Sequence, residues 1–445
     1  MFLQITDGTI SVTLSGSGTV TGCTYFPTSA QLSDKSLVPV AETAEVVLKG
    51  TQANIRSVIN DLEILLQRAL ERSKSNVGDR VYVNYKPVDG DATTYRSEVF
   101  EGRVVTPENP GLRRLGDTAP TMVIGVVWLR APGWDGAEVE LALSATSQAS
   151  STGGRTIANN PATGNWVQID GATIGGVLPS PMRLQLANST GATQPYRKFM
   201  IGINAKGDPS SFVHSYQGEA RISGGSVVAD GTASGSNVLE ITLGSSPTAY
   251  LWALAAADIQ QAGGRRFRVW MRTAGATGSL FVRPQIRNTG SAVLWSGDEI
   301  ALNAPVYATW RDLGVVPLPP GGGGVLANDL RLALVVRGTG VVQIDILQLT
   351  ALDSYAYLEL PPAGITVANT NSVVYDGIER QVYVLAGTLR TPLPTAYGGG
   401  LFLQPRRTQR IHTMYQIDPA SGTDYAPVGG TLSVRVYYRP RRLTV

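Results

Sequence analysis

The residues that could carry out chemistry are few in this sequence, and their spacing matches no catalytic motif. Its two histidines, His214 and His412, lie far apart, and neither belongs to an HExxH pattern of the kind that binds zinc on a helix. There is also no GxSxG turn that would expose a nucleophilic serine. We therefore predict that the chain is not an enzyme.

Two weaker patterns, a glycine-rich stretch and possible carboxylate pairs, are weighed against the prediction that the chain is not an enzyme. The stretch 16–22, GSGTVTG, has the glycines of a phosphate-binding loop, but its spacing is wrong and no helix follows it, so a turn is favoured. The paired carboxylates of a glycosidase cannot be recognised from spacing alone. A β-sandwich glycosidase therefore stays open as an alternative.

A single cysteine, Cys23, excludes an internal disulfide framework and every metal site built from several cysteines. The absence of disulfides in a chain of this size favours folding in a reducing cytoplasm. The N-terminus, MFLQITDGTISVTL, lacks the basic and apolar regions of a signal peptide. No apolar stretch is long enough to span a membrane, so we expect no membrane insertion.

Composition points to assembly. Charged residues make up 16% of the 445 residues, and the formal net charge is +3, whereas about 25% charged residues is typical of soluble domains. A surface with so few charges is expected when other subunits cover part of it. The 50 glycines and 26 prolines leave a second explanation, a high density of turns.

The C-terminal arginines suggest either nucleic-acid binding or ion pairing between subunits. Because the overall charge is nearly balanced, the basic surface that nucleic acid requires is not expected. We therefore predict no nucleic-acid partner and assign Arg439, Arg441 and Arg442 to an assembly interface.

Aromatic side chains are the remaining binding candidates, because an aromatic ring can stack on the apolar face of a sugar. Tyr250, Trp252 and Trp295 flank expected turns, and we consider them as carbohydrate-binding residues, although packing in the core is the favoured alternative.

The pattern of elements predicts a mainly β chain of several antiparallel β-sandwiches with one amphipathic helix. Asp7-Gly8 joins two alternating runs in a hairpin. Apolar residues at helical spacing from Ile55 to Leu70 predict a helix capped by Thr51, whose apolar stripe packs on the sheet of its own domain. The charged residues on its other faces are candidates for contacts between subunits, namely Arg56, Glu63 and Arg72.

Turn spacing divides the chain into three expected domains. Residues 1–110 form a sandwich with the helix. Residues 118–205 and 355–445 together form a second, discontinuous sandwich, because each flank has too few strands to stand alone. Residues 212–352 form a third sandwich inserted between these flanks.

The 212–352 segment resembles a jelly-roll carbohydrate-binding module. The resemblance rests on GEARISGG, RFRVWMRT, TWRDLGVV and the closing VVQIDILQL. It implies a sugar-binding role and a structural Ca²⁺ near the first and last strands, where Glu219 and Asp345 occupy comparable places. Two carboxylates supply only part of the six to eight oxygen ligands of Ca²⁺.

The rest of the chain resembles structural proteins of long-tailed bacteriophages, particularly distal-tail or baseplate components. The resemblance rests on the order of strands and helix in 1–110 and on VVWLRAPGWDG, NNPATGNWVQIDGATIGGVLPSPMRLQLAN and LSVRVYYRPRR. It implies a virion tail protein, assembled in the host cytoplasm as a ring or symmetric set of copies. Its partners would be other copies, other tail proteins and a host cell-surface glycan. A free carbohydrate-binding or adhesin protein is the alternative.

Overall fold

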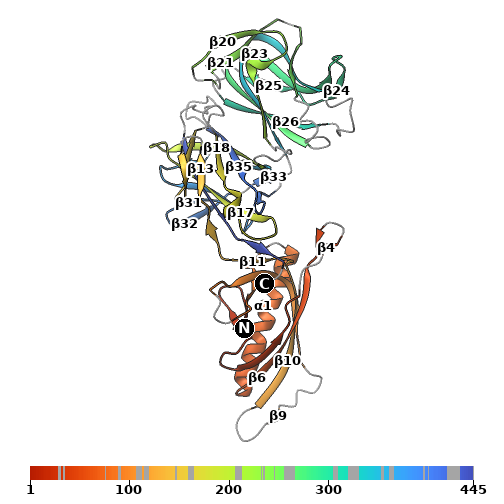
Figure 1. The fold of residues 1–445 in the computed structure, drawn as a ribbon, viewed down its shortest axis with the longest axis vertical. Coiled ribbons are helices and arrows are strands. Elements are labelled where there is room, and N and C mark those ends of the chain that lie inside the picture. The colour runs from red at the N-terminus through yellow and green to blue at the C-terminus, as the bar shows by residue number, and fades with distance from the viewer. Residues whose placement is uncertain are drawn as a thin grey trace. The chain divides into compact units, whose positions relative to one another are not determined.

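Antiparallel sheets dominate the computed structural model, so the predicted fold class is confirmed (Figure 1). Among the described residues, α1 (Gln52–Ser75) is the one α-helix. The structure describes the whole chain except residues 29–31, 34–35, 76, 89–91, 107–112, 115–119, 146–147, 159–164, 206–212, 232, 234–235, 245, 255–265, 304–308, 319–329, 352–354, 360–364, 394–395, 399, 418–430 and 444–445.

The chain forms two compact units, and each contains segments that are distant in sequence. Unit 1 comprises Met1–Val139, Gly175–Ser180 and Arg439–Val445. Unit 2 comprises Glu140–Ile174 and Pro181–Tyr438. The chain therefore returns to unit 1 at its C-terminal end.

Unit 1 contains a ten-stranded sheet whose main path runs β2–β1–β7–β8–β10–β6–β3, with three short strands off this path. A separate ribbon pairs β4 (Leu32–Ser33) with β5 (Ser36–Leu37). The strands of the large sheet are β1 (Phe2–Thr6), β2 (Ser11–Thr13), β3 (Val20–Tyr25), β6 (Val40–Lys49), β7 (Val81–Lys86), β8 (Tyr95–Val105), β9 (Arg113–Arg114), β10 (Pro120–Arg130), β11 (Trp134–Asp135) and β37 (Arg441–Arg442).

The hairpin and the helix of unit 1 form where the sequence predicts them. Asp7 accepts hydrogen bonds from the backbone of Thr9 and Ile10, and Gly8 takes the positive φ of 92° that the turn needs. The Thr51 hydroxyl accepts a hydrogen bond from the Asn54 backbone and caps α1.

The predicted end of the first domain differs from the structure. The strand in MVIGVVWL, expected to open the second sandwich, is β10, and it pairs with β6 along Thr121–Arg130 and with β8 along Gly125–Arg130. A central strand of unit 1 therefore lies beyond residue 110. The strands on either side of residues 106–119, β8 and β10, are neighbours in the same sheet.

Unit 2 contains two eight-stranded sheets made from residues on both sides of the 212–352 segment. In the first sheet, β17 pairs with β30 and β36. Its strands are β12 (Val139–Glu140), β15 (Arg155–Ala158), β17 (Ser180–Asn188), β30 (Ser372–Asp376), β31 (Gln381–Ala386), β32 (Leu389–Pro392), β34 (Phe402–Leu403) and β36 (Thr431–Tyr438).

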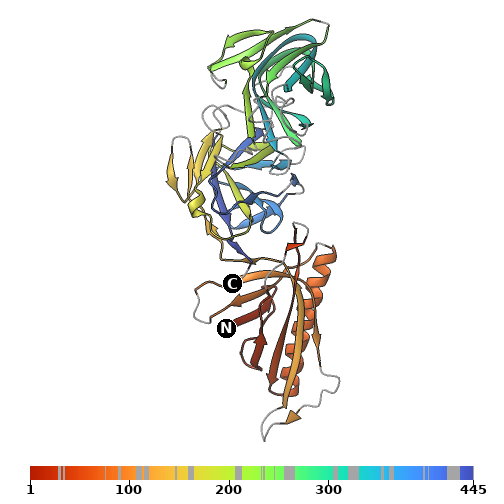
Figure 2. The same cartoon turned by 45° about the vertical axis from the view of Figure 1, so that its right-hand side comes forward.

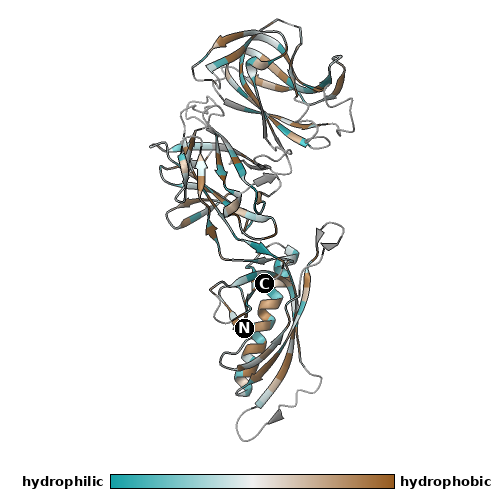
Figure 3. Cartoon of the chain, viewed as in Figure 1, coloured by the Kyte–Doolittle hydropathy of each residue, from teal (hydrophilic) through white to brown (hydrophobic). Residues whose placement is uncertain are grey.

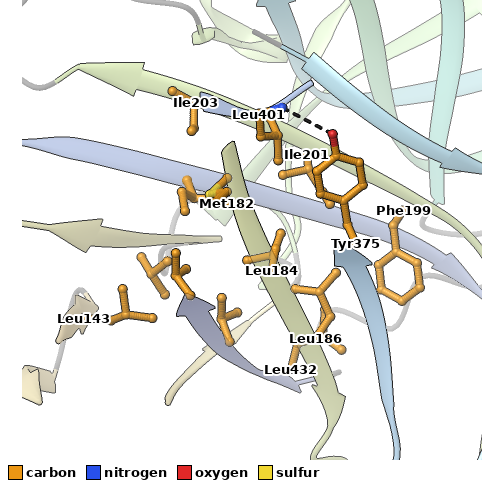
Figure 4. Packing of buried hydrophobic residues seen from close by; sticks show 14 of the residues in the cluster. Leu143, Met182, Leu184, Leu186, Phe199, Ile201, Ile203, Tyr375, Leu401 and Leu432 are labelled. Carbon is orange, nitrogen blue, oxygen red and sulfur yellow. Dashed lines mark hydrogen bonds between the residues drawn. The ribbon is translucent and has the colours of Figure 1, made fainter. Parts of the chain in front are cut away.

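In the second sheet, β18 pairs with β28, β29 and β35. Its strands are β13 (Leu143–Ala145), β14 (Gln148–Ser151), β16 (Trp166–Ile169), β18 (Gln194–Ala205), β28 (Tyr355–Glu359), β29 (Ile365–Val367), β33 (Ala396–Gly398) and β35 (Gln409–Ile417). The apolar faces of the two sheets form one core. In Figure 4, Leu184 and Leu186 from β17 lie among Phe199, Ile201 and Tyr375.

The 212–352 segment forms a nine-stranded antiparallel sheet with its own core. We keep the name jelly roll, which the sequence resemblance implies, for this segment. Two long strands, β23 (Arg266–Asn288) and β27 (Leu330–Ala351), pair along most of their length. The other strands are β19 (Val213–Gln217), β20 (Ser226–Ala229), β21 (Asn237–Leu243), β22 (Thr248–Ala253), β24 (Val293–Ser296), β25 (Ile300–Asn303) and β26 (Thr309–Pro317).

Within the described part of the chain, no helix is both long and apolar enough to cross a membrane.

Candidate functional site

The sheet of unit 1 has one face covered by α1 and one face left open (Figure 2). On the covered face, Ile55, Leu62 and Leu66 of the helix are buried against strand residues such as Val126 and Trp128. Because side chains alternate along a strand, the intervening residues of β6, β8 and β10 point to the opposite face.

The open face is apolar at its centre. Val123 and Val105 are 49% and 43% exposed, and Val47, Val127 and Leu129 are partly exposed. They lie on three neighbouring strands, where Val123 is paired with Val47. Hydrophobic colouring follows β10 in Figure 3. We call these five residues the valine face.

Charged residues lie among the members of the valine face. Glu101 is paired with Leu129 and Arg103 with Val127, and Glu45 is paired with Gly125. All three charged side chains are exposed. The open face is therefore a mixed surface, with apolar side chains at its centre and charges of both signs beside them.

A buried ion pair lies on the covered side of the same sheet. The Glu42 and Arg130 side chains are both fully buried, and Arg130 Nη2 donates to Glu42 Oε1 at 2.7 Å. The Tyr25 hydroxyl donates to the other carboxylate oxygen at 2.8 Å. Burial, together with the Glu42 charge, raises the pKa of Tyr25 above its ordinary value.

This ion pair fixes the backbone where the chain leaves β3. The Thr28 N–H donates to Glu42 Oε1 at 2.9 Å, and the Thr28 carbonyl accepts from Arg130 Nη2 at 2.8 Å. The Arg130 guanidinium also lies 4.2 Å from the centre of the Trp134 ring. Removing either charge of this pair would leave the other buried without its partner, which is costly.

The three charged helix residues chosen from the sequence lie away from the core of unit 1. Arg56 and Glu63 are exposed, and Arg72 is partly exposed and donates to the Gly78 carbonyl at 3.2 Å. The predicted apolar stripe faces the sheet, with Leu62 fully buried. Arg56 and Glu63 are accessible to a neighbouring subunit, and their role stays a prediction.

The C-terminal arginines contact residues of their own unit. Arg441 forms an ion pair with Asp135, with 2.9 Å between Nε and Oδ1, and Arg439 donates to the Gly136 carbonyl at 3.3 Å. Arg442 is exposed and lies 5.7 Å from the Tyr95 ring centre. Arg439 and Arg441 thus hold the C-terminal segment in unit 1. Part of the hydrogen-bonding capacity of each guanidinium is therefore used within the unit.

The aromatic candidates for sugar binding lie inside the jelly roll. Tyr250 is 6% exposed and Trp252 is 1% exposed, and the indole N–H of Trp252 donates to the Gln217 carbonyl at 3.0 Å. Trp295 is partly buried and packs against the same core. Because β22 alternates, Tyr250 and Trp252 point inward and offer no ring face to a ligand; core packing, the alternative considered from the sequence, describes their position.

The two expected calcium ligands, Asp345 and Glu219, lie in different surroundings, and a calcium site stays a prediction. The Asp345 carboxylate is fully buried and forms an ion pair with Arg272, so the Arg272 guanidinium already balances its negative charge. Glu219 lies in a short 3₁₀ turn at Gly218–Ala220. Among the described residues, no group of three or more histidines, cysteines, aspartates and glutamates comes together.

His412 illustrates why a rare residue type is a weak functional signal. It lies on β35 opposite Trp166, and both of its ring nitrogens are shielded from solvent although the residue as a whole is only partly buried. Burial, together with the nearby charge of Arg410, lowers the pKa of His412 to about 3. The ring is therefore neutral at pH 7.

Sequence reasoning missed the valine face and the Glu42–Arg130 pair. A signal for the valine face was present, since MVIGVVWL is apolar at consecutive positions and such strands are usually buried on both faces. No comparable signal exists for the ion pair, because its members are 88 positions apart and each has the alternating neighbours of an exposed residue.

Comparisons with known proteins give no family assignment. No protein-family model matches the sequence, and no curated protein sequence matches it. Eight chains among solved structures match it.

Three of these solved structures show how distant the matches are. SPP1 Dit, a hub adsorption protein of a phage, is 8% identical with a TM-score of 0.31, and the match covers 99% of this chain and 98% of Dit. A Podospora anserina GH26-CBM35 β-(1,4)-mannanase is 18% identical with a TM-score of 0.23; the match covers 31% of this chain and 27% of the mannanase. Tailspike protein 4 of bacteriophage CBA120 is 13% identical with a TM-score of 0.19, over 34% of this chain and 19% of that one. All three TM-scores are below 0.5, and resemblance at that level does not define a shared fold.

Proposed function

We propose that the chain is a non-enzymatic structural protein of the tail of a long-tailed bacteriophage, of the distal-tail or baseplate type. In this proposal it is part of the virion, having been assembled in the host cytoplasm. Copies associate through unit 1 into a ring or another symmetric set, and they contact other tail proteins. The jelly roll is displayed by this assembly and contacts a glycan of the host cell surface.

The valine face is the observation that carries the proposal of self-assembly. Strands that are apolar on both sides are usually covered on both sides, and unit 1 covers one side of β10 with α1. A second copy is the partner that suits the exposed charges of both signs, Glu45, Glu101 and Arg103, because each copy supplies acids and bases to the other. The tail assignment itself rests on the sequence resemblance.

The free energy gained by covering the valine face suits a subunit interface. Val105 and Val123 each expose about half of their surface, and covering that area contributes about 1 kcal/mol for each residue. Val47, Val127 and Leu129 add smaller amounts. Covering one valine face therefore contributes a few kcal/mol to association. In a symmetric assembly the same contribution is repeated at every contact between copies.

The test of assembly uses the whole chain and two variants. Native mass spectrometry and light scattering over a range of concentrations should find a defined oligomer. The double variant Val123→Lys/Val127→Lys places repelling charges at the centre of the face and should shift the protein to monomer. Val77→Lys, at a valine that is 72% exposed elsewhere in unit 1, is the matched control and should leave the oligomer intact.

Two results would contradict this proposal. One is a wild-type chain that stays monomeric at every concentration, which would instead support the alternative of a free carbohydrate-binding protein. The other is an oligomer that persists in the double variant. The non-enzymatic part is tested separately by incubating the chain with a panel of polysaccharides, where we expect no new reducing ends.

A further inference from the structure

Arginines gather on the outer face of one sheet of the jelly roll. On β23, Leu280, Val282 and Ile286 belong to the core, so the alternate residues point outward. On β27, Leu330, Leu332, Leu334 and Val336 belong to the core in the same way. The outward positions of these two strands hold four arginines, Arg283, Arg287, Arg331 and Arg337, and we call them the arginine face.

The strand register brings two of these arginines directly opposite each other. Arg287 is the pairing partner of Arg331, while Arg337 is opposite Phe281 and Arg283 is opposite Val335. Like charges at directly opposed positions of a sheet repel each other. An anion bound between Arg287 and Arg331 would remove that repulsion, so this position favours an acidic ligand.

Neighbouring side chains hold the arginines in place. Arg287 donates through Nε and Nη2 to Gln285 Oε1, at 2.9 and 2.7 Å. Gln285 is 7% exposed, and its amide in turn donates to the Ser296 hydroxyl at 3.1 Å. The guanidinium of Arg287 is thus oriented before any ligand arrives, which lowers the entropy lost on binding.

Glu299 orients the other pair of arginines. It accepts from Arg337 Nε at 2.9 Å and from Arg283 Nη2 at 3.3 Å. The side chains of Arg337 and Arg283 remain 43% and 42% exposed. One carboxylate therefore serves two arginines, and both keep surface available to solvent.

Arginines elsewhere in the jelly roll are arranged differently. Arg272 forms a buried ion pair with Asp345, and Arg268 lies 3.6 Å from Asp312 on the neighbouring strand. These arginines each have their own carboxylate. The arginine face is distinct because Arg283 and Arg337 share the one carboxylate of Glu299, while Arg287 is held by the neutral side chain of Gln285.

We propose that the arginine face binds an acidic polysaccharide through its carboxylate groups; the inference rests on the glycan-contact role proposed above for the jelly roll. Guanidinium groups bind carboxylates through two parallel hydrogen bonds. Ser296 is exposed on the neighbouring strand β24, where it is paired with Gln285, and its hydroxyl is a polar group that suits a sugar hydroxyl.

The same observations disfavour a nucleic-acid ligand. Proteins that bind single-stranded nucleic acid stack bases on exposed aromatic rings. The one aromatic ring among the outward residues of this stretch of β23, Phe281, is covered by the Arg337 guanidinium, which lies 4.3 Å from its centre. A basic face whose aromatic ring is covered suits a charged sugar chain better.

The experiment measures binding of the full chain to polygalacturonate and to the same polymer with its carboxylates methyl-esterified. Isothermal titration calorimetry should show binding to polygalacturonate that weakens as salt is raised, and no binding to the ester. Arg287→Gln and Arg331→Gln should each weaken binding about tenfold, the effect of losing one charge-assisted contact. Arg266→Gln, at an exposed arginine of β23 outside the face, is the matched control and should change affinity less than twofold.

Three outcomes would overturn the inference: equal binding of the acid and the ester, no effect of the two face variants, or a single-stranded DNA oligonucleotide of equal charge binding as tightly as polygalacturonate. Thermal unfolding of each variant confirms that it folds. The oligomeric state is measured on the same samples. A wild-type chain that forms the oligomer but does not bind polygalacturonate would contradict the proposed ligand and leave the proposed assembly intact. A wild-type chain that stays monomeric and binds polygalacturonate would contradict the proposed assembly and leave the proposed ligand intact.

Discussion

Unit 1 and the jelly roll are stabilised in the same way inside and differ outside. Each contains a fully buried arginine–carboxylate pair, Arg130 with Glu42 and Arg272 with Asp345. The outer face of the unit 1 sheet carries valines, whereas the outer face of the jelly-roll sheet carries arginines. The interiors account for the fold, and the outer faces carry the two proposals: self-association through the valine face and binding of an acidic polysaccharide at the arginine face.

The largest expected effect comes from breaking the covered face of unit 1. Leu62→Asp places a carboxylate in the helix–sheet core, where Leu62 is fully buried, and the desolvation of that charge should abolish soluble expression. Glu63→Ala, at the adjacent exposed position, should give normal yield. A soluble, folded Leu62→Asp protein that loses only its oligomeric state would show that the helix stripe is itself the subunit interface.

The next effect tests whether the two buried ion pairs are equivalent. Glu42→Gln and Asp345→Asn each leave a buried guanidinium without its counter-charge, and each should lower the free energy of unfolding by about 3–5 kcal/mol. Urea denaturation at pH 7 measures both. Glu45→Gln, on the open face of β6, is the control and should stay within about 0.5 kcal/mol of wild type. A loss below about 1 kcal/mol in only one of the two variants would show that the two buried ion pairs do not contribute equally to stability.

A smaller effect is expected from His412 as the pH falls. Its pKa in the folded chain, about 3, is below the ordinary value of 6.5, so below pH 6.5 the unfolded chain takes up a proton that the folded chain does not. This contribution is absent above pH 6.5 and lowers stability by about 1.4 kcal/mol for each pH unit below it, down to about pH 3. Urea midpoints at pH 7 and pH 5 should differ less in His412→Gln than in wild type. Equal differences would show that the ring is accessible to protons.

The smallest effects on folding are expected from the two outer faces. Val105→Ser and Arg331→Gln should change the free energy of unfolding by less than about 0.5 kcal/mol, measured on the monomer. Arg331→Gln should be neutral or slightly stabilising because it removes the repulsion with Arg287. A loss of about 2 kcal/mol in either variant would mean that the face contributes to the interior, and the contrast between inside and outside would fail.

Local patterns in the sequence predict local structure well. The Asp7-Gly8 hairpin and the α1 helix with its Thr51 cap depend on neighbouring residues, and both form as predicted. The assignment of MVIGVVWL to the second domain was wrong because strand pairing joins distant residues, and turn spacing carries no information about the partner.

The candidate sites were harder to predict for a related reason. Along β22, Tyr250 and Trp252 point to the core and Leu251 between them points outward. The sequence shows that these side chains alternate, but which side faces the core depends on how the strand is placed in its sheet. The arginine face depends on the pairing of Arg287 with Arg331. Pairing across such a distance in sequence becomes visible only in the folded chain.

The position of the jelly roll in the topology has an evolutionary consequence. β18 and β28 are adjacent antiparallel strands, with Gly202 paired to Tyr355, and the whole jelly roll lies between them in the sequence. It therefore occupies the place that a hairpin loop would take. A lineage can exchange this cassette for another, or lose it, without altering a strand of the surrounding sheets. If the two proposals hold, ligand choice can diversify quickly while the parts proposed to build the assembly stay the same.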